Sequence, residues 1–367
     1  MINESSSAPL PAAEPAGDLD RAGALVVGAV ADGSLPGAVA AVGRGETTLA
    51  TWVAGEADAT PGARRPITRG TVFDLASLTK IVATTTTVLA LVGQGRLGLD
   101  DPVTGYLPAF TAGDQGPVTI RHLLTHTSGL PAMRTFYQWC ATRSEVLADL
   151  LATPLEVPPG TRVAYSDLGF MLLGEIVAAV TGQAFDVAVG ELVTGPLGLP
   201  TAGFNPAGPP ERFAATERRP DGTPWVGVVH DENARAMGGV AGHAGLFGRL
   251  ADLTAFATWW VSDADGPIPV PLRRQAEACW TDGLGGRRGL GWTCRGDRYD
   301  ILGVGWPDAA VSHTGFTGTS LGLDSGTGLW VVLLTNGVHF GRDASAVKAL
   351  RRNLHTAVAA ALLGPPG

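Results

Sequence analysis

Strand-like and helix-like patterns lie in different parts of this 367-residue chain, and their distribution limits the folds that the chain can adopt. Near the N-terminus, Ala38–Val42 and Thr47–Val53 flank a short glycine-containing turn and predict a β-hairpin. Strand-like segments return near the C-terminus, at Gly289–Cys294, Thr319–Asp324 and Leu329–Thr335. We therefore expect an α+β fold, in which both chain ends build one mostly antiparallel sheet that is covered by helices.

The middle of the chain has helical patterns separated by loops rich in proline and glycine. Apolar residues recur at helical spacing in Leu19–Ala31, Thr119–Thr125, Ser144–Leu151, Asp167–Val180, Phe185–Val193, Asp252–Val261 and from about Asp343 onward. We expect residues 18–85 and 286–367 to form a sheet domain, with residues 86–285 inserted as a mainly helical domain. A cleft is expected where the two meet.

Residues 1–17 predict a disordered leader. This leader has neither the basic region nor the apolar region of a secretory signal, so we expect a cytoplasmic protein. The three cysteines (Cys140, Cys279 and Cys294) follow no motif spacing and are expected to remain reduced. We identify no apolar run long enough to cross a bilayer, because glycine, threonine and charged residues interrupt each candidate.

The charge of the chain also limits its partners. The net charge is -8 and no basic stripe is present, which argues against nucleic acid as a partner. His122 and His126 have a spacing that can bind a metal, but Leu123 follows the first histidine and no third ligand is evident. We expect these histidines to form structural hydrogen bonds, with no metal and no organic cofactor. Beyond that, the sequence does not define the roles of His126, His230 or His243, and it indicates no oligomeric state.

Ser77 and Lys80 form the first candidate chemical group. Residues three apart on a helix share a face, so the two side chains are expected to be neighbours. A lysine desolvated against apolar neighbours can lose its proton and act as the base for a serine nucleophile. If Ser77 opens the helix, its N–H is also free to bind an oxyanion. A Ser-x-x-Lys match alone also occurs on ordinary surface helices.

Tyr165 and Asp167 form the second group, just before an apolar helix. A tyrosine at such a junction can project into a cleft and relay protons. The alternative is that Tyr165 packs in the core and Asp167 caps the helix.

The third group is the run 312–319, which contains His313, Thr314, Gly315 and Phe316. Its small residues let a substrate approach an edge strand, and the Phe316 N–H is available as a second oxyanion donor.

The order of these three motifs resembles the penicillin-binding-protein and serine β-lactamase superfamily. The chain looks most similar to the class C-like branch, which includes carboxylesterases, D-amino-acid peptidases and acyltransferases. The resemblance extends to the segments 121–131, 165–170, 230–234, 238–247 and 331–336, and it covers about residues 20–360. It implies a β-lactamase/transpeptidase-like fold and acyl-enzyme chemistry.

The resemblance also implies residue roles. Ser77 would be the nucleophile, Lys80 the base that activates it, and Tyr165 the group that passes the proton to the leaving group. The backbone N–H groups of Ser77 and Phe316 would form the oxyanion hole. Asp167, His313, Thr314, Gly315 and Phe316 are the candidate substrate-binding residues.

Two residues depart from the pattern of the superfamily. His313 stands where many relatives have a lysine, and it is largely neutral near pH 7 at its ordinary pKa. Asp167 replaces the asparagine of the Tyr-x-Asn pattern and adds a negative charge. Both changes favour neutral or cationic acyl substrates over anionic ones.

Three functions are compatible with these residues. The first is a hydrolase of a small ester or amide, with water as acceptor. The second is a transacylase that passes the acyl group to an amine or alcohol in secondary metabolism. The third is a catalytically silent binding protein on the same fold. The joint presence of Ser77, Lys80 and Tyr165 argues against the third, and we expect a small-molecule acyl substrate with or without a second acceptor.

Overall fold

The computed structural model describes residues 19–111 and 117–364. The leader expected at residues 1–17 lies outside these ranges. One seven-stranded sheet, in the order β3-β2-β1-β12-β11-β10-β9, dominates the structure, and each of its strand pairs is antiparallel. Its strands are β1 (Gly37–Arg44), β2 (Thr47–Asp58), β3 (Arg65–Pro66), β9 (Thr293–Cys294), β10 (Val311–Thr314), β11 (Ser320–Asp324) and β12 (Leu329–Thr335).

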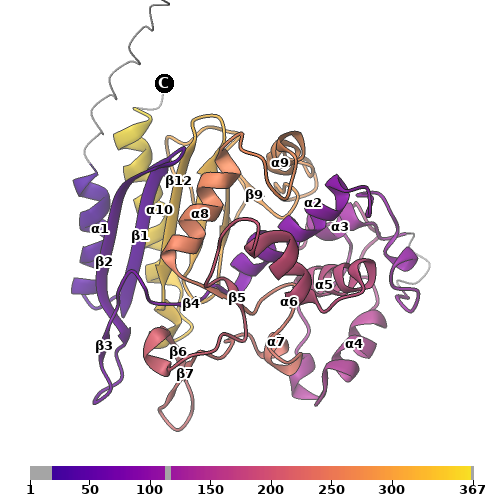
Figure 1. Cartoon of the computed structure of the whole chain (residues 1–367), viewed down its shortest axis with the longest axis horizontal. Coiled ribbons are helices and arrows are strands. Elements are labelled where there is room, and N and C mark those ends of the chain that lie inside the picture. The colour runs from indigo at the N-terminus through magenta and orange to yellow at the C-terminus, as the bar shows by residue number, and fades with distance from the viewer. Residues whose placement is uncertain (1–18, 112–116, 365–367) are drawn as a thin grey trace, which may run out of the picture.

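Pairing of β1 with β12 joins the two ends of the chain at the centre of this sheet. The register runs from Ala38 opposite Thr335 to Arg44 opposite Leu329. Figure 1 shows the indigo N-terminal strands beside the yellow C-terminal ones. This pairing confirms the expected α+β fold with a sheet built by both chain ends.

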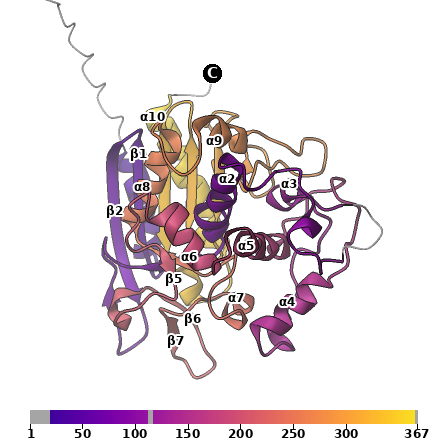
Figure 2. The ribbon, with the colours of Figure 1, turned by 45° about the vertical axis from the view of Figure 1, so that its right-hand side comes forward.

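Ten α-helices are described. They are α1 (Asp20–Ala31), α2 (Thr86–Gly93), α3 (Ile120–Leu124), α4 (Arg143–Leu151), α5 (Asp167–Thr181), α6 (Phe185–Val189), α7 (Glu232–Ala236), α8 (Leu250–Val261), α9 (Val270–Glu277) and α10 (Ser345–Leu362). The short strands β4 (Phe73–Asp74), β8 (Leu246–Gly248) and β5 (Gly203–Phe204) form a second sheet, and β6 (Ala215–Arg218) pairs with β7 (Pro224–Val226). Figures 1 and 2 show α3, α4 and α5 gathered to one side of the main sheet.

The central strands of the main sheet are buried on both faces. Strand β12 shows why: Leu329, Val331 and Leu333 face α1 and α10, while Trp330 and Val332 face the larger core that includes α8. Side chains alternate across a strand, so a strand covered on both faces must be apolar at every position. The continuous apolar run of β12 follows from this position in the fold.

The expected division into a sheet domain and an inserted helical domain remains a prediction. Helix α8 falls within residues 86–285, yet it packs against β12, β1 and β11 (Figure 1). The range 86–285 therefore also supplies a helix that covers one face of the main sheet.

Three expectations about local structure need correction. Of Gly289–Cys294 only Thr293–Cys294 is a strand, because Gly291 has a φ of +80° and lies against Thr85, which ends the extended conformation. The predicted helix Phe185–Val193 divides into α6 and a π-helical turn. The stretch Ala76–Gly93 is long and apolar enough to cross a membrane, contrary to our expectation. It is 83% buried within the protein, so core packing accounts for its apolar composition.

Candidate active site

The loop that carries Ser77 is short and strained. Ser77 is the second residue of the 3-10 helix Ala76–Leu78, which follows β4. Ala76 has a φ of +46°, in the left-handed region that residues with a side chain seldom adopt. The Asp74 carboxylate accepts a hydrogen bond from the Ala76 N–H at 2.9 Å and holds this turn. The Ser77 N–H consequently lies at the start of a helix, where helical carbonyls do not reach it.

Two threonines from the third motif hold the same loop from the opposite side. Thr317 Oγ1 donates to the Asp74 carbonyl at 2.8 Å, and Thr319 Oγ1 donates to the Leu75 carbonyl at 3.0 Å. Gly315 lies so close that a Cβ there would be 2.5 Å from the Leu75 carbonyl oxygen. We did not predict these roles from the sequence. The signal for them was the pair of threonines at positions 317 and 319, shortly after His313.

Lys80 lies beside Ser77, as the i, i+3 spacing predicts. Its side chain is completely buried, and Nζ lies 2.9 Å from Ser77 Oγ and 2.9 Å from the His243 carbonyl oxygen. Asp167 Oδ1 lies 2.7 Å from the same nitrogen. Three acceptors therefore surround an ammonium that has three N–H donors.

The surroundings of Lys80 act on its pKa in opposite directions. Burial alone would lower the pKa of Lys80, but the neighbouring Asp167 carboxylate and Tyr165 side chain outweigh it and raise that pKa above its ordinary value. This direction favours a charged Lys80, and the role of Lys80 as the base for Ser77 remains a prediction. A charged Lys80 stabilises the fold at every pH below about 10.4, the ordinary lysine pKa, and this contribution is lost only as pH rises through the higher folded-state value.

Tyr165 approaches Lys80 from the start of α5. The Lys80 Nζ lies 5.1 Å from the centre of the Tyr165 ring. Asp167 is the first residue of α5, and Ser166 is the N-cap whose hydroxyl accepts from the Gly169 N–H. The capping role that we considered for Asp167 thus belongs to Ser166, which leaves the Asp167 carboxylate free to pair with Lys80.

His126 fixes the position of Tyr165. Its carbonyl accepts the Ala164 N–H at 2.8 Å, and its Nδ1 accepts the Ser166 N–H at 3.0 Å. The two rings lie 4.5 Å apart. A φ of +58° at His126 lets one residue reach both peptide groups that flank Tyr165. Burial, with the nearby charge of Arg288, holds the pKa of His126 well below its usual range, so its Nδ1 remains an acceptor.

Replacing His126 by phenylalanine is expected to lower turnover by about tenfold, because it keeps the ring but leaves the buried Ser166 N–H without an acceptor. Asparagine should retain most of the activity, since its side-chain oxygen occupies the position of Nδ1 and it tolerates positive φ. Steady-state kinetics of both variants, with melting temperatures measured alongside, would check this. Equal turnover by the phenylalanine variant and the wild-type protein would contradict it.

Strand β10 brings His313 and Thr314 to this site. Strand β9 pairs only with Val311 and Ser312, so the second half of β10 has no neighbour on that side, as expected for an edge. His313 is 2% exposed, and its Nδ1 lies 3.0 Å from the Thr314 carbonyl oxygen. Burial and the charge of Lys80 hold the pKa of His313 well below its usual range, so the ring is neutral. It therefore offers a substrate neither a positive charge nor much surface.

Phe316 follows directly in the turn after β10. Within the described ranges its backbone N–H donates to no carbonyl, which leaves it available as an oxyanion donor. Its side chain is 54% exposed and stacks on His230, with ring centres 5.5 Å apart. His230 and Phe316 thus pack on each other, and Glu217 contacts the His230 ring at 2.9 Å.

The remaining histidines have structural contacts. His243 Nε2 lies 2.9 Å from Asp231, the N-cap of α7, and its carbonyl accepts from Lys80. His122 accepts the Thr119 N–H at 3.2 Å in a capping box, which confirms the hydrogen-bonding role that we expected. In residues 19–111 and 117–364, no group of three or more His, Cys, Asp or Glu side chains is arranged to hold a metal ion.

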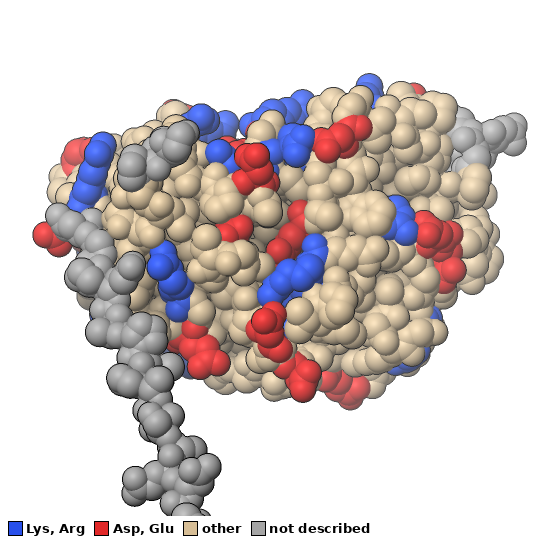
Figure 3. Space-filling model, turned by 90° about the horizontal axis from the view of Figure 1, so that it is seen from above, with Lys and Arg blue, Asp and Glu red and all other residues tan. Residues whose placement is uncertain are grey.

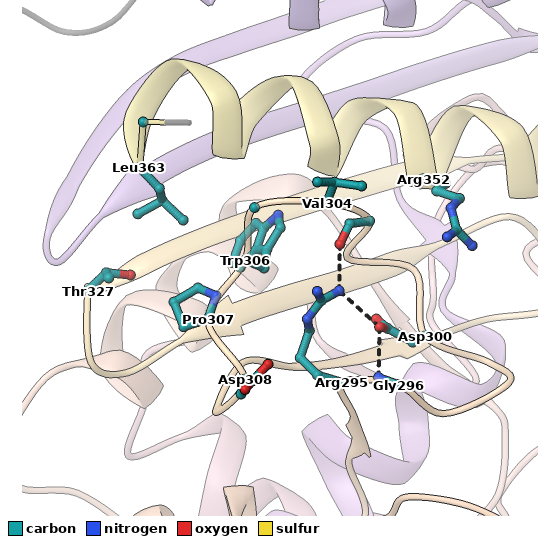
Figure 4. A pocket seen from close by; sticks show the side chains of 13 residues that line it. Arg295, Gly296, Asp300, Val304, Trp306, Pro307, Asp308, Thr327, Arg352 and Leu363 are labelled. Atoms are coloured by element: carbon teal, nitrogen blue, oxygen red, sulfur yellow. Dashed lines mark hydrogen bonds and ion pairs between the residues drawn. The ribbon is translucent and has the colours of Figure 1, made fainter. Parts of the chain in front are cut away.

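A separate cavity of about 850 Å³ lies between the loop 295–308 and the end of α10. Figure 4 shows Arg295 and Asp300 on the loop and Arg352 on the helix. Its lining includes none of Ser77, Lys80 or Tyr165. Charged side chains of both signs are scattered over the face shown in Figure 3, without a field of a single sign. The chemical group around Ser77 therefore remains the candidate active site.

Comparison with known proteins agrees with this geometry. The sequence model of the β-lactamase family matches residues 22–356. The chain belongs to the β-lactamase family. A relative from Escherichia coli (strain K12), named as a candidate D-alanyl-D-alanine carboxypeptidase, is 33% identical over 306 residues, which are 74% of this chain and 70% of the relative.

Two further proteins are similar to this member of the β-lactamase family. The N-acetylmuramyl-L-alanine amidase of Bacillus subtilis (strain 168) is 33% identical over 302 residues, which are 73% of this chain and 68% of the amidase. The structure of EstCE1, described as a hydrolase with promiscuous acyltransferase activity, has a TM-score of 0.76 at 24% identity and covers 93% of this chain and 98% of its own. The latter likeness shows the fold. Family membership and the names of the relatives indicate hydrolase or peptidase activity.

Proposed function

We propose that this β-lactamase-family protein is a serine hydrolase that cleaves a small ester or amide through an acyl-enzyme on Ser77. The observation that carries the proposal is the contact between Ser77 Oγ and the buried Lys80 ammonium, 2.9 Å apart, on a strained loop. Such a buried charge costs stability unless it is compensated, and here the compensating carboxylate, Asp167, holds the ammonium beside the nucleophile.

The charge on Lys80 assigns the proton transfer to Tyr165. As Ser77 Oγ bonds to the substrate carbonyl carbon, its proton passes to the Tyr165 oxygen, and the carbonyl oxygen becomes an oxyanion. The N–H groups of Ser77 and Phe316 stabilise that oxyanion. Tyr165 then protonates the leaving alcohol or amine as its bond to carbon breaks. Tyr165 enters this sequence as the phenolate, which the Lys80 ammonium stabilises, and it returns to the phenolate once the leaving group is protonated.

Hydrolysis follows when water attacks the acyl-enzyme and gives its proton to the Tyr165 phenolate. Tyr165 then passes that proton to Ser77 Oγ as the bond from Oγ to the acyl carbon breaks, which releases the acid and restores Ser77. The hydrolase names of the relatives support water as the acceptor. The acyltransferase activity ascribed to EstCE1 supports the alternative, in which an amine or alcohol takes the acyl group at the same step.

Turnover of a panel of activated esters, with and without added amines, tests the proposal. We expect wild-type protein to release acid, and Ser77→Ala to release none above background. Amide product that increases with amine concentration, at the expense of acid, would make transacylation the main activity. Equal turnover by the wild type and Ser77→Ala would refute the proposal.

The charge of Asp167 predicts a substrate preference. Its side chain is 20% exposed beside Ser77, and His313 supplies no positive charge to bind a substrate carboxylate. Neutral esters should therefore react faster than matched esters that carry a carboxylate on the acyl group. Asp167→Asn should narrow the ratio of the two kcat/KM values by roughly tenfold, or about 1.4 kcal/mol. A preference of the wild-type protein for the anionic ester would contradict this prediction.

A further inference from the structure

Helix α10 places one arginine beneath the loop that carries Phe316. Arg351 is 6% exposed, and its Nη2 donates to the carbonyl oxygens of Gly315 and Thr319, each at 2.7 Å. Burial lowers the pKa of Arg351 to about 9, and in the described part of the chain no carboxylate opposes this effect. Arg351 is therefore a buried cation whose contacts are with backbone carbonyls.

The fold does not need this cation to satisfy those carbonyls. The Gly315 carbonyl also accepts the Gly318 N–H at 3.1 Å, and the Thr319 carbonyl accepts the Gly315 N–H at 2.7 Å. A buried charge without a counter-ion costs several kcal/mol, roughly, in a protein interior. A structural role alone therefore does not explain an arginine at this position.

The geometry of the peptide group supplies a reason. The Gly315 carbonyl and the Phe316 N–H belong to one planar peptide and point in opposite directions. A charge-assisted hydrogen bond to the carbonyl fixes that plane and polarises the peptide, which strengthens its N–H as a donor. That N–H is the second candidate donor to the oxyanion.

We propose that Arg351 is a positioning residue for oxyanion binding, which orients and polarises the peptide between Gly315 and Phe316. This inference rests on the proposed acyl-enzyme function. It gives α10, at the far end of the sequence from Ser77, an indirect influence on the reaction. Arg351 does not touch the substrate and acts only through this peptide.

Arg351→Met tests the proposal, with Arg273→Met as the matched control. Arg273 is also buried and also donates to backbone carbonyls, those of Trp259, Trp260 and Ala264, away from the candidate site. We expect Arg351→Met to lower kcat by at least about tenfold with little change in KM, since loss of a whole oxyanion donor costs about 10²–10³-fold. Affinity for phenylboronic acid, whose serine adduct is tetrahedral, should fall in parallel. Arg351→Lys should recover part of both, and Arg273→Met should change only the melting temperature.

A second readout does not depend on activity. In protein labelled with ¹⁵N-phenylalanine, the Phe316 amide proton should shift upfield in Arg351→Met and stay unchanged in Arg273→Met. An unmoved Phe316 resonance, or wild-type kcat in Arg351→Met, would overturn the inference. If no ester acylates the wild-type protein, the proposed function fails. The Phe316 amide resonance would still report whether Arg351 polarises the peptide.

Discussion

Replacing Lys80 by methionine is expected to lower turnover by about 10³-fold or more, although methionine matches the length and apolar character of the lysine stem. The variant loses the ammonium that contacts Ser77 Oγ and lies against the Tyr165 ring. A single general acid or base typically raises a reaction rate by about 10²–10⁴-fold. Here one cation supports both the nucleophile, Ser77, and the proton carrier, Tyr165. Steady-state kinetics with the best ester of the panel measures the effect.

The chain provides a close control, because Lys348 is its only other lysine and is exposed on α10. Lys348→Met should leave turnover and melting temperature unchanged. Lys80→Met should also lose stability, on the order of 3 kcal/mol, because Asp167 remains without its cation. The double variant Lys80→Met/Asp167→Asn should regain stability but not activity. Activity within threefold of the wild type in Lys80→Met would contradict the proposed chemistry.

Replacing Tyr165 by phenylalanine is expected to lower turnover by about 10²–10⁴-fold. This change removes only the phenol oxygen and retains the ring that packs on His126 and faces Lys80. The melting temperature should therefore stay close to that of the wild-type protein, which separates a chemical role from a structural one. Tyr137→Phe, at an exposed tyrosine, is the matched control.

The pH dependence distinguishes the two candidate bases. Because the pKa of Lys80 is raised, Lys80 should stay charged below about pH 10. Its deprotonation should therefore not lower the wild-type rate in that range. In Asp167→Asn, burial of Lys80 is no longer opposed by that carboxylate, so its pKa should fall and the rate should decline as pH rises. Near-wild-type turnover in Tyr165→Phe would instead make Lys80 the proton carrier.

Features that depend on local spacing were predictable from the sequence. Three-residue spacing brings Ser77 and Lys80 together on any helical turn. The strand-like segments at both ends of the chain predicted the antiparallel sheet, because such segments must pair with one another. The irregular segment before β9 was mistaken for a strand, since its apolar residues are buried in the core without sheet pairing.

Features that depend on distant contacts were not predictable. The charge of Lys80 follows from a 2.7 Å approach of Asp167, which lies 87 positions later in the chain, and spacing does not report such a distance. His126 reaches Tyr165 only because its backbone adopts positive φ. Arg351 lies in an amphipathic helix, where an arginine is normally read as solvent-exposed.

The central claim is that Ser77 carries the acyl group, and intact-mass spectrometry of the wild-type protein and Ser77→Ala after mixing with an activated ester tests it most directly. The account predicts a mass increment equal to the acyl group on the wild-type protein, absent from Ser77→Ala and decaying as water or an amine removes it. Equal labelling of both proteins would contradict the account, because the acyl group would then reside on another residue.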